Sequence, residues 1–506
     1  MAEGRNALVI APTGSGKTLA GFLWSIDRLA ARPEVDDKER LRVIYVSPLK
    51  ALAADIERNL RTPLSGVRAA AGRLSLKASD IRVSVRTGDT PQEERRKFAS
   101  APPDILITTP ESLFLILTSQ ARAALRYVDT VIVDEVHALA GNKRGAHLAV
   151  SLERLDHLAG RPLQRLGLSA TVRPPDEVAR FLGGVHPVTV VNPVATKTFD
   201  LSIVVPVEDM TQPGEITGDV TSNGGEREIE EESLEAVARA SAWPHIEGRI
   251  LELIRKNSST IVFVNSRRLA ERLCNHLNEI AGDEVARAHH GSVSKERRRL
   301  IEEDLKAGRL SAVVATSSLE LGIDMADVEL VVQVEAPGSV ASGLQRIGRA
   351  GHQVGAVSRG VMFPKYRGDL LECAVVSERM RAGLIEASRC PRNPLDVLAQ
   401  QIVAMVAMDD WEEGDLEAII ARAAPFHDLP ASAFEATLDM LSGRYPSHQF
   451  AELRPRLSWD RATGILTARS NAQSLAVTSG GTIPDRGLFG VFLAGRERAR
   501  VGELDE

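Results

Sequence analysis

Short runs of large apolar residues recur over the first part of the chain, and small or polar residues directly follow each run. These runs stand at 8–10, 43–46, 105–107 and 131–133. Uninterrupted apolar runs of this length are typical of parallel strands that are buried on both faces. Between them, apolar residues return at helical spacing, as from 19 to 29. The pattern predicts an α/β domain whose polar residues gather at the carboxyl ends of its strands.

A second α/β pattern follows a change in composition. From 210 to 235 the chain is rich in Gly, Thr, Asn and Glu and has few large apolar residues, which predicts a solvated linker. Apolar runs then return at 260–264, 312–316 and 330–334. The predicted fold class is therefore α/β, with two tandem parallel-sheet domains.

The pattern changes again near residue 389. Helical spacing at 395–408 and 416–424 predicts short amphipathic helices, whose size is compatible with a winged-helix module. The last fifty residues are rich in Gly and Thr and predict β structure that stops unfinished. The predicted domains are a first α/β domain at 1–207, an acidic linker at 208–245, a second α/β domain at 246–389, a winged-helix module at 390–455 and the beginning of a further β-containing domain at 456–506.

Composition excludes several classes of protein. At 506 residues, with 43% hydrophobic and 26% charged residues, the chain has the makeup of an ordinary globular protein. No apolar run approaches the roughly 20 residues of a membrane span. The three cysteines form no C-x-x-C pair, which argues against a zinc site, an iron–sulfur cluster or a disulfide framework and suits the cytoplasm. The net charge of −6 neither supports nor excludes a nucleic-acid partner.

The segment 11–18, Ala-Pro-Thr-Gly-Ser-Gly-Lys-Thr, stands between the first predicted strand and the first predicted helix. In this position it predicts a phosphate-binding loop, because glycines allow backbone N–H groups to surround phosphates. Lys17 would reach the β- and γ-phosphates of ATP, and Thr18 would bind Mg²⁺. Ala11 stands where the first glycine of the pattern is usual. The predicted ATP-binding residues of this loop are Thr13, Gly14, Ser15, Gly16, Lys17 and Thr18.

Acidic and hydroxyl side chains follow two other strands of the same domain. Asp134 is predicted to hold Mg²⁺ together with Thr18, and Glu135 to polarise the attacking water. His137 comes directly after this pair, and Ser169 and Thr171 follow another apolar run. We expect these three to couple the nucleotide site to a nucleic-acid groove. Taken singly, each of these segments has a solvated turn or a plain strand end as its alternative interpretation.

The second domain contains two arginines three residues apart, Arg346 and Arg349, preceded by Gln345. Two guanidinium groups at this spacing predict a γ-phosphate sensor that stabilises charge on the transferring phosphoryl group. We expect Gln345, like His137, to couple the nucleotide site to the nucleic-acid groove. Gly322 and Asp324 stand where a loop would approach the ribose of the nucleotide. The alternative interpretation of the arginines is a solvated helix face.

Contacts with nucleic acid are predicted from groups at or after strand ends. Hydroxyls, backbone N–H groups and cations in these places suit phosphates, so they would hold a strand without reading its sequence. Each of them has a structural hydroxyl or a solvated cation as its alternative. The candidates are Ser47, Pro48, Lys50, Thr87, Gly88, Thr108, Thr109, Ser266, Arg267, Gly291, Ser292 and Thr316.

Four further segments narrow the interpretation to one family. Residues 144–148, 337–352, 393–401 and 480–487 resemble the large helicase-related (Lhr) family of superfamily 2, DEAD/DEAH-type helicases. The resemblance implies two RecA-like domains, a winged helix and a further domain. It also implies an ATP- and Mg²⁺-dependent motor that moves 3′ to 5′ on single-stranded DNA and unwinds DNA or RNA–DNA duplexes. The resemblance further implies a role in DNA repair and a place in the bacterial or archaeal cytoplasm at the nucleoid. By motif, six residues act on ATP and Thr109 contacts the strand; the six are Lys17, Thr18, Asp134, Glu135, Arg346 and Arg349.

Two departures from the family pattern predict a fragment. Members carry an adenine-contacting glutamine upstream of the phosphate loop, whereas Met1 here stands close before Ala11, and residues 502–506 stop inside a predicted domain. Two other interpretations therefore stay open. One is an RNA-remodelling ATPase of the same superfamily, and the other is a nucleic-acid-binding fragment without turnover.

Overall fold

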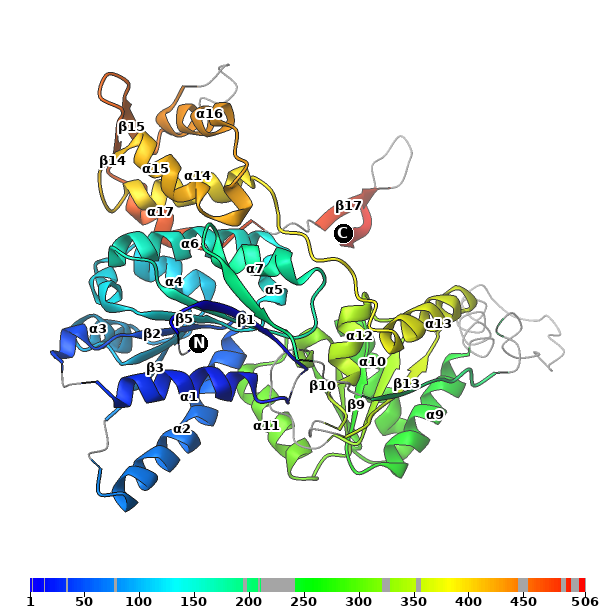
Figure 1. Ribbon diagram of the computed structural model, residues 1–506. Coiled ribbons are helices and arrows are strands. Elements are labelled where there is room, and N and C mark those ends of the chain that lie inside the picture. The colour runs from blue at the N-terminus through cyan, green and yellow to red at the C-terminus, as the bar shows by residue number, and fades with distance from the viewer. Residues whose placement is uncertain are drawn as a thin grey trace. The chain divides into compact units, whose positions relative to one another are not determined.

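The chain forms two compact units, whose elements are labelled in Figure 1. The first unit comprises Met1–Ile10, Lys17–Asn192 and Ala387–Glu506, and the second comprises Ala11–Gly16 and Pro193–Glu386. The computed structural model describes residues 1, 3–12, 14–32, 35–76, 80–193, 198–207, 210, 242–320, 328–351, 356–444, 454–483, 488–492 and 500–505.

A seven-stranded, wholly parallel sheet organises the first unit, in the order β3-β4-β2-β5-β6-β1-β7. Val46 pairs with both Thr108 and Val133, and Ile10 pairs with Ser169, so the segments after these strands begin along one edge of the sheet. The strands are β1 (Asn6–Ile10), β2 (Val43–Val46), β3 (Val83–Arg86), β4 (Ile105–Thr108), β5 (Thr130–Val133), β6 (Gln164–Ser169) and β7 (Val188–Val191).

Helices supply the apolar cores on both faces of this sheet. Phe22 of α1 and Leu52 of α2 pack with Tyr45 and Ile132 in one core, while α4, α6 and α7 contribute to the other. Capping side chains define some of the helix ends, as where the Thr109 side chain accepts a hydrogen bond from the Ser112 backbone at the start of α4. The helices are α1 (Lys17–Ala30), α2 (Lys50–Arg73), α3 (Gln92–Ser100), α4 (Pro110–Leu117), α5 (His137–Ala140), α6 (Lys143–Ala159) and α7 (Pro175–Gly183), with 3₁₀ turns η1 (Asp37–Glu39) and η2 (Gln120–Tyr127).

The second unit has a six-stranded parallel sheet in the order β10-β11-β9-β12-β13-β8. Its strands are β8 (Phe199–Ile203), β9 (Thr260–Phe263), β10 (Ala286–His289), β11 (Ala312–Ala315), β12 (Leu330–Val334) and β13 (Ser358–Phe363). Its helices are α9 (Trp243–Lys256), α10 (Arg267–Ala281), α11 (Lys295–Lys306), α12 (Val340–Ile347) and α13 (Arg367–Arg381), with the 3₁₀ turn η3 (Ser317–Leu319).

The strands predicted from apolar runs are present, and the predicted α/β class with two parallel sheets is confirmed. The predicted domain boundary at residue 207 does not agree with the position of one strand. Strand β8 precedes that boundary, yet it pairs along its whole length with β13 in the second sheet. The predicted linker at 210–235 lies outside the described residues except for Met210.

Residues 387–506 form a C-terminal module within the first unit. Its helices are α14 (Leu395–Val406), α15 (Glu413–Ala421), α16 (Ala431–Ser442) and α17 (Ala472–Thr478), with the 3₁₀ turn η4 (Ala424–Phe426). Its strands form a three-stranded antiparallel sheet and an antiparallel pair, made of β14 (Trp411–Glu412), β15 (Leu457–Asp460) and β16 (Ile465–Ala468), and of β17 (Leu488–Phe492) and β18 (Arg500–Asp505).

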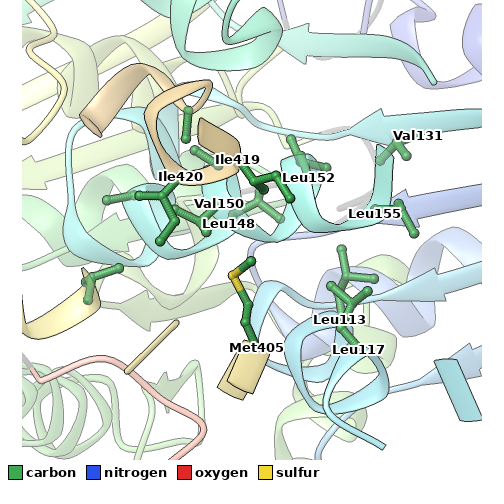
Figure 2. Close-up of a cluster of buried hydrophobic side chains, with 14 of the residues drawn as sticks. Leu113, Leu117, Val131, Leu148, Val150, Leu152, Leu155, Met405, Ile419 and Ile420 are labelled. Carbon is green, nitrogen blue, oxygen red and sulfur yellow. The ribbon is translucent and has the colours of Figure 1, made fainter. Parts of the chain in front are cut away.

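The C-terminal module shares one hydrophobic core with the first sheet and its helices. Figure 2 shows Ile419 and Ile420 of α15 beside Leu148 and Leu152 of α6, with Met405 of α14 nearby. Because these side chains are buried against one another, the module cannot separate from α6 without exposing apolar surface to water. Among the described residues, no helix is both long enough and apolar enough to cross a membrane.

Candidate nucleotide and nucleic-acid sites

The segment between β1 and α1 has the backbone that a phosphate-binding loop requires. Gly14 and Gly16 have φ angles of 79° and 84°, in the left-handed region where other residues are strained. The Ser15 hydroxyl donates a hydrogen bond of 2.7 Å to the Pro12 carbonyl, which closes the turn. Helix α1 begins directly afterwards at Lys17. The start of a helix offers unpaired N–H groups and a positive dipole end, both of which favour a bound phosphate.

Asp134 and Glu135 are buried at the end of β5. An Asp134 carboxylate oxygen accepts a hydrogen bond of 2.9 Å from the Glu135 N–H, and Glu135 has a φ of 45°, so this backbone turn is tightly constrained. Burial and the neighbouring Glu135 raise the pKa of Asp134. Burial lowers the pKa of Lys17, and the charges of Glu135 and Asp134 oppose that shift. Two carboxylates and one ammonium thus lie close together in a poorly solvated place.

These residues fit a magnesium ion bound with a nucleotide. Thr18 and Asp134 both lie beside the Tyr45 hydroxyl, which places a hydroxyl and a carboxylate oxygen near each other. Oxygen ligands are those that Mg²⁺ prefers, and the ion usually takes its remaining ligands from phosphates and water. A divalent cation at this place would oppose the mutual repulsion of the two buried carboxylates, Asp134 and Glu135. Among the described residues, no group of three or more His, Cys, Asp or Glu side chains could hold a metal without such help.

The structure brings two of the predicted coupling residues together. His137 Nδ1 lies 3.1 Å from Ser169 Oγ and 3.5 Å from a Glu135 carboxylate oxygen. The Ala170 N–H donates to the same Nδ1 over 3.3 Å, so this nitrogen accepts and the ring proton belongs on Nε2. The His137 ring thus lies between the end of β6 and the Glu135 carboxylate.

The two predicted arginines differ in their surroundings within the second unit. Arg346 is buried and donates to Asn265 and Gln333 over 3.0 and 3.1 Å, and it forms an ion pair of 3.2 Å with Glu320. Arg349 is also buried, and its guanidinium donates to the backbone carbonyl of Glu320 over 2.8 Å. The side-chain hydrogen bonds of Arg346 hold its guanidinium in place on three sides.

Other predicted site residues have plainer positions. Gln345 lies on α12 and is partly buried, whereas Thr171 is exposed after β6. Thr13, Gly322 and Asp324 lie outside the described residues.

A cation lies over a glycine at the edge of the first sheet. Lys50, the first residue of α2, forms an exposed ion pair of 2.7 Å with Asp89. Its ammonium lies so close to Gly88 that a side chain at Gly88 would meet it at 2.9 Å. Thr87 is buried beside them, with its N–H bonded to the Thr90 hydroxyl over 2.9 Å. The loop after β3 and the start of α2 thus present a cation next to accessible backbone.

The remaining candidates of the first unit have partners inside the protein. The Thr108 hydroxyl donates to the Arg86 carbonyl over 2.7 Å, and the Thr109 hydroxyl caps α4. The Pro48 carbonyl accepts from Arg144 over 2.8 Å. Ser47 is also buried. These residues shape the edge of the sheet through contacts inside the protein.

The second unit repeats the arrangement of cation and glycine. Arg267 begins α10, and its guanidinium lies 3.1 Å from the Ser292 hydroxyl and 3.6 Å from the position of a side chain at Gly291. Ser266 caps α10 through its side chain, and Thr316 directly precedes η3. In both units a basic residue at the start of a helix therefore covers a glycine in the loop after an edge strand.

Three residues near these sites were not singled out in the sequence. Tyr45 is the one hydroxyl-bearing residue in β2, which is otherwise Val and Ile. Glu320 pairs with Arg346, and Arg144 joins Pro48 to Glu111 through a contact of 2.6 Å. A polar atom inside an apolar run was a signal for Tyr45. Arg144 begins the family-like segment 144–148, but its contacts with Pro48 and Glu111 could not be predicted because these partners are distant along the chain. No sequence pattern marked Glu320.

Three family descriptions match this chain. Residues 1–180 match the DEAD/DEAH box helicase family, and residues 246–353 match the helicase conserved C-terminal domain. Residues 378–506 match the winged helix domain of large helicase-related proteins. These matches assign the two parallel-sheet parts and the C-terminal module to helicase domains.

Individual relatives agree with the family matches. The chain is 58% identical to the Lhr helicase/probable uracil glycosylase of Mycolicibacterium smegmatis and 54% identical to the Lhr helicase/uracil glycosylase of Escherichia coli. All of this chain is covered in both comparisons, but it spans only 34% and 35% of those proteins. The solved structure of Mycobacterium smegmatis helicase Lhr bound to ssDNA and AMP-PNP is 60% identical, with a TM-score of 0.85 over 98% of this chain and 60% of that one. The chain therefore belongs to the Lhr family of DEAD/DEAH-box helicases.

Proposed function

We propose that the chain is the ATP-driven motor of a helicase that moves 3′ to 5′ along single-stranded DNA and unwinds DNA or RNA–DNA duplexes. The observation that carries the proposal is the grouping of Lys17 with the buried carboxylates of Asp134 and Glu135. A solved relative that is 60% identical was bound to ssDNA and AMP-PNP, a ligand pair that fits this function. The direction, the duplex preference, a role in DNA repair and a place in the cytoplasm at the nucleoid rest on the family resemblance.

The proposed ATP site uses the loop of residues 11–18 and the acidic pair that follows β5. The loop N–H groups and Lys17 bind the β- and γ-phosphates, and Thr18 and Asp134 are the protein ligands of Mg²⁺. The ion, when bound with ATP, neutralises phosphate charge. Glu135 orients the attacking water, a role supported by its burial and constrained backbone.

We assign different tasks to the two arginines. Arg349 stabilises charge on the transferring phosphoryl group, a contribution that can be worth about 10³–10⁵ in rate. Arg346 holds the arginine-bearing segment in place, since its guanidinium is committed to Glu320, Asn265 and Gln333. Hydrolysis then depends on both α/β domains, which allows ATP turnover to drive movement.

Strand binding is proposed to use the repeated arrangement of cation and glycine. Lys50 with Gly88 and Arg267 with Gly291 would each bind phosphates, supported by their exposed cations and adjacent backbone. Such contacts carry no base information, so the motor is expected to act on many sequences. His137 and Ser169 would transmit the state of the acidic pair.

Strand displacement tests the proposal directly. Duplexes with a 3′ tail and with a 5′ tail are incubated with the protein, ATP and Mg²⁺, and Lys17→Ala serves as the control. Unwinding of the 3′-tailed DNA or RNA–DNA duplex alone is expected. Equal unwinding of both tails, or unwinding by Lys17→Ala, would overturn the proposed function.

A further inference from the structure

Tyr45 places a hydroxyl in the middle of an apolar strand. Its side chain is fully buried in β2, and its ring stacks on that of Phe22 with 4.8 Å between ring centroids and 13° between planes. The ring therefore fills its place in the core between the sheet and α1. Phenylalanine would make the same packing, so packing explains the ring and leaves the hydroxyl unexplained.

The hydroxyl is buried and has no hydrogen-bond partner of normal length and angle. It nevertheless lies beside the Asp134 carboxylate and the Thr18 hydroxyl. A buried hydroxyl without a partner costs free energy of folding. A second state of the site in which the hydroxyl has partners would account for its presence.

The register of the sheet explains why Tyr45 reaches these two groups. Tyr45 pairs with Ile132 on β5, and Asp134 stands two residues after Ile132 in the sequence. Side chains two apart on a strand share a face, so Tyr45 and Asp134 are diagonal neighbours, a separation that an aromatic side chain spans. Thr18 reaches the same place from α1, which covers this face.

We propose that Tyr45 is a positioning residue for the magnesium ligands, an inference that rests on the proposed ATPase function. When Mg²⁺ and ATP are bound, the Thr18 hydroxyl would donate a hydrogen bond to Tyr45 Oη, and the Tyr45 hydroxyl would donate one to the Asp134 carboxylate. This direction of donation would leave oxygen lone pairs of Thr18 and Asp134 available to the ion. Partners of metal ligands are typically worth about 10–100-fold in metal affinity or activity.

The test is Tyr45→Phe, with Tyr366→Phe as the matched control because Tyr366 is exposed in the second unit. Binding of a fluorescent ATP analogue is titrated with Mg²⁺, and melting temperature is measured without nucleotide. We expect Tyr45→Phe to need about 10-fold more Mg²⁺ for half-maximal binding. Its melting temperature should equal or exceed that of the unaltered chain, because the variant no longer buries an unpaired hydroxyl.

A Mg²⁺ requirement in Tyr45→Phe that equals that of the unaltered chain and of Tyr366→Phe would overturn the inference while leaving the proposed function intact. If the melting temperature of Tyr45→Phe were then also lowered, the hydroxyl would be purely structural. Absence of Mg²⁺-dependent nucleotide binding in the unaltered chain would instead contradict the proposed function, and the inference with it.

Discussion

Replacing Arg422 tests how the C-terminal module is held to the first α/β domain. Arg422 follows α15 and lies 2.9 Å from a carboxylate oxygen of Glu153 and 3.7 Å from one of Asp156, both of which are buried on α6. Arg165 contacts the same two carboxylates at 2.8 Å each. Two positive and two negative charges thus form one cluster that is buried except at Arg422, and the His186 ring lies 3.2 Å from Arg422 and 3.8 Å from Asp156. The variant Arg422→Met keeps the apolar stem and removes the charge.

The expected loss of folding stability in Arg422→Met follows from the surplus negative charge that remains. Removing one partner of a buried ion pair costs roughly 3–5 kcal/mol. The Arg422 side chain is 33% exposed, so water can enter the gap, and we expect the lower end of that range, about 3 kcal/mol. At tenfold per 1.4 kcal/mol, amide hydrogens of α7 and α15 should exchange about 150-fold faster. Exchange in α9 and α10 of the second unit should not change.

The loss should also depend on pH. Burial already raises the pKa of Asp156, and Arg165 opposes the shift. Without Arg422 this pKa rises further. A carboxyl whose pKa is higher in the folded than in the unfolded chain contributes stability at low pH and loses it as pH rises through the folded value. The cost of Arg422→Met relative to the unaltered chain should therefore be larger at about pH 8 than at about pH 5.

Hydrogen exchange followed by mass spectrometry measures both effects. Arg444→Met is the matched control, because Arg444 is an exposed arginine of the same module. The double variant Glu153→Gln with Arg422→Met should recover part of the loss, since it removes the surplus charge. Unchanged exchange in α7 and α15, or a cost that is equal at both pH values, would refute the electrostatic account of this contact.

The remaining predictions concern ATP hydrolysis and strand binding. Lys17→Ala and Glu135→Gln should each nearly abolish ATP hydrolysis while Glu135→Gln still binds ATP, and retention of more than about a tenth of kcat, roughly 1.4 kcal/mol of barrier, would count against these roles. Arg349→Ala should lower kcat steeply and leave strand affinity without ATP nearly unchanged, and a normal kcat would remove its assignment. Arg346→Ala should in addition lower the melting temperature, because it leaves Glu320 without its ion pair; an unchanged melting temperature would argue against the holding role. Strand affinity should fall steeply with added salt and vary little with sequence, whereas a flat dependence of log K on log[salt] would contradict phosphate contacts.

The α/β architecture could be predicted because buried parallel strands appear in the sequence as short, uninterrupted apolar runs. The run at 131–133 has no polar interruption, and Asp134 follows it at once. The same pattern of apolar runs followed by polar residues predicted that the strand ends share one edge of the sheet. The register of Val46 with Thr108 and Val133 confirms this. Local pattern and tertiary arrangement agree here because both faces of the sheet are covered.

Long-range pairing was beyond the reach of such patterns. The alternation in β8 indicates a strand but does not say which sheet it joins, and its partner β13 lies far along the chain. The apolar faces of α14 and α15 likewise predict burial without naming α6 as the surface that covers them. Arg422 in the sequence is an ordinary charged residue after a helix. Only the fold brings it to Glu153, because the shared core places α15 against α6.

Individual site residues could be predicted where their role depends on local position in the sequence, and could not where it depends on distant neighbours. Lys17, Asp134 and Glu135 could be proposed because each stands at a fixed place relative to a strand end. Tyr45 and Glu320 could not, since their importance comes from neighbours supplied by other elements.

Steady-state ATP hydrolysis with and without single-stranded DNA tests whether the chain is a DNA-driven motor. We expect slow hydrolysis by the protein alone and strong stimulation by DNA, which Lys17→Ala abolishes. An equal series with single-stranded RNA decides between a DNA motor and an RNA-remodelling ATPase. Hydrolysis that DNA does not stimulate, or no hydrolysis at all under conditions where the strand binds, would contradict the account.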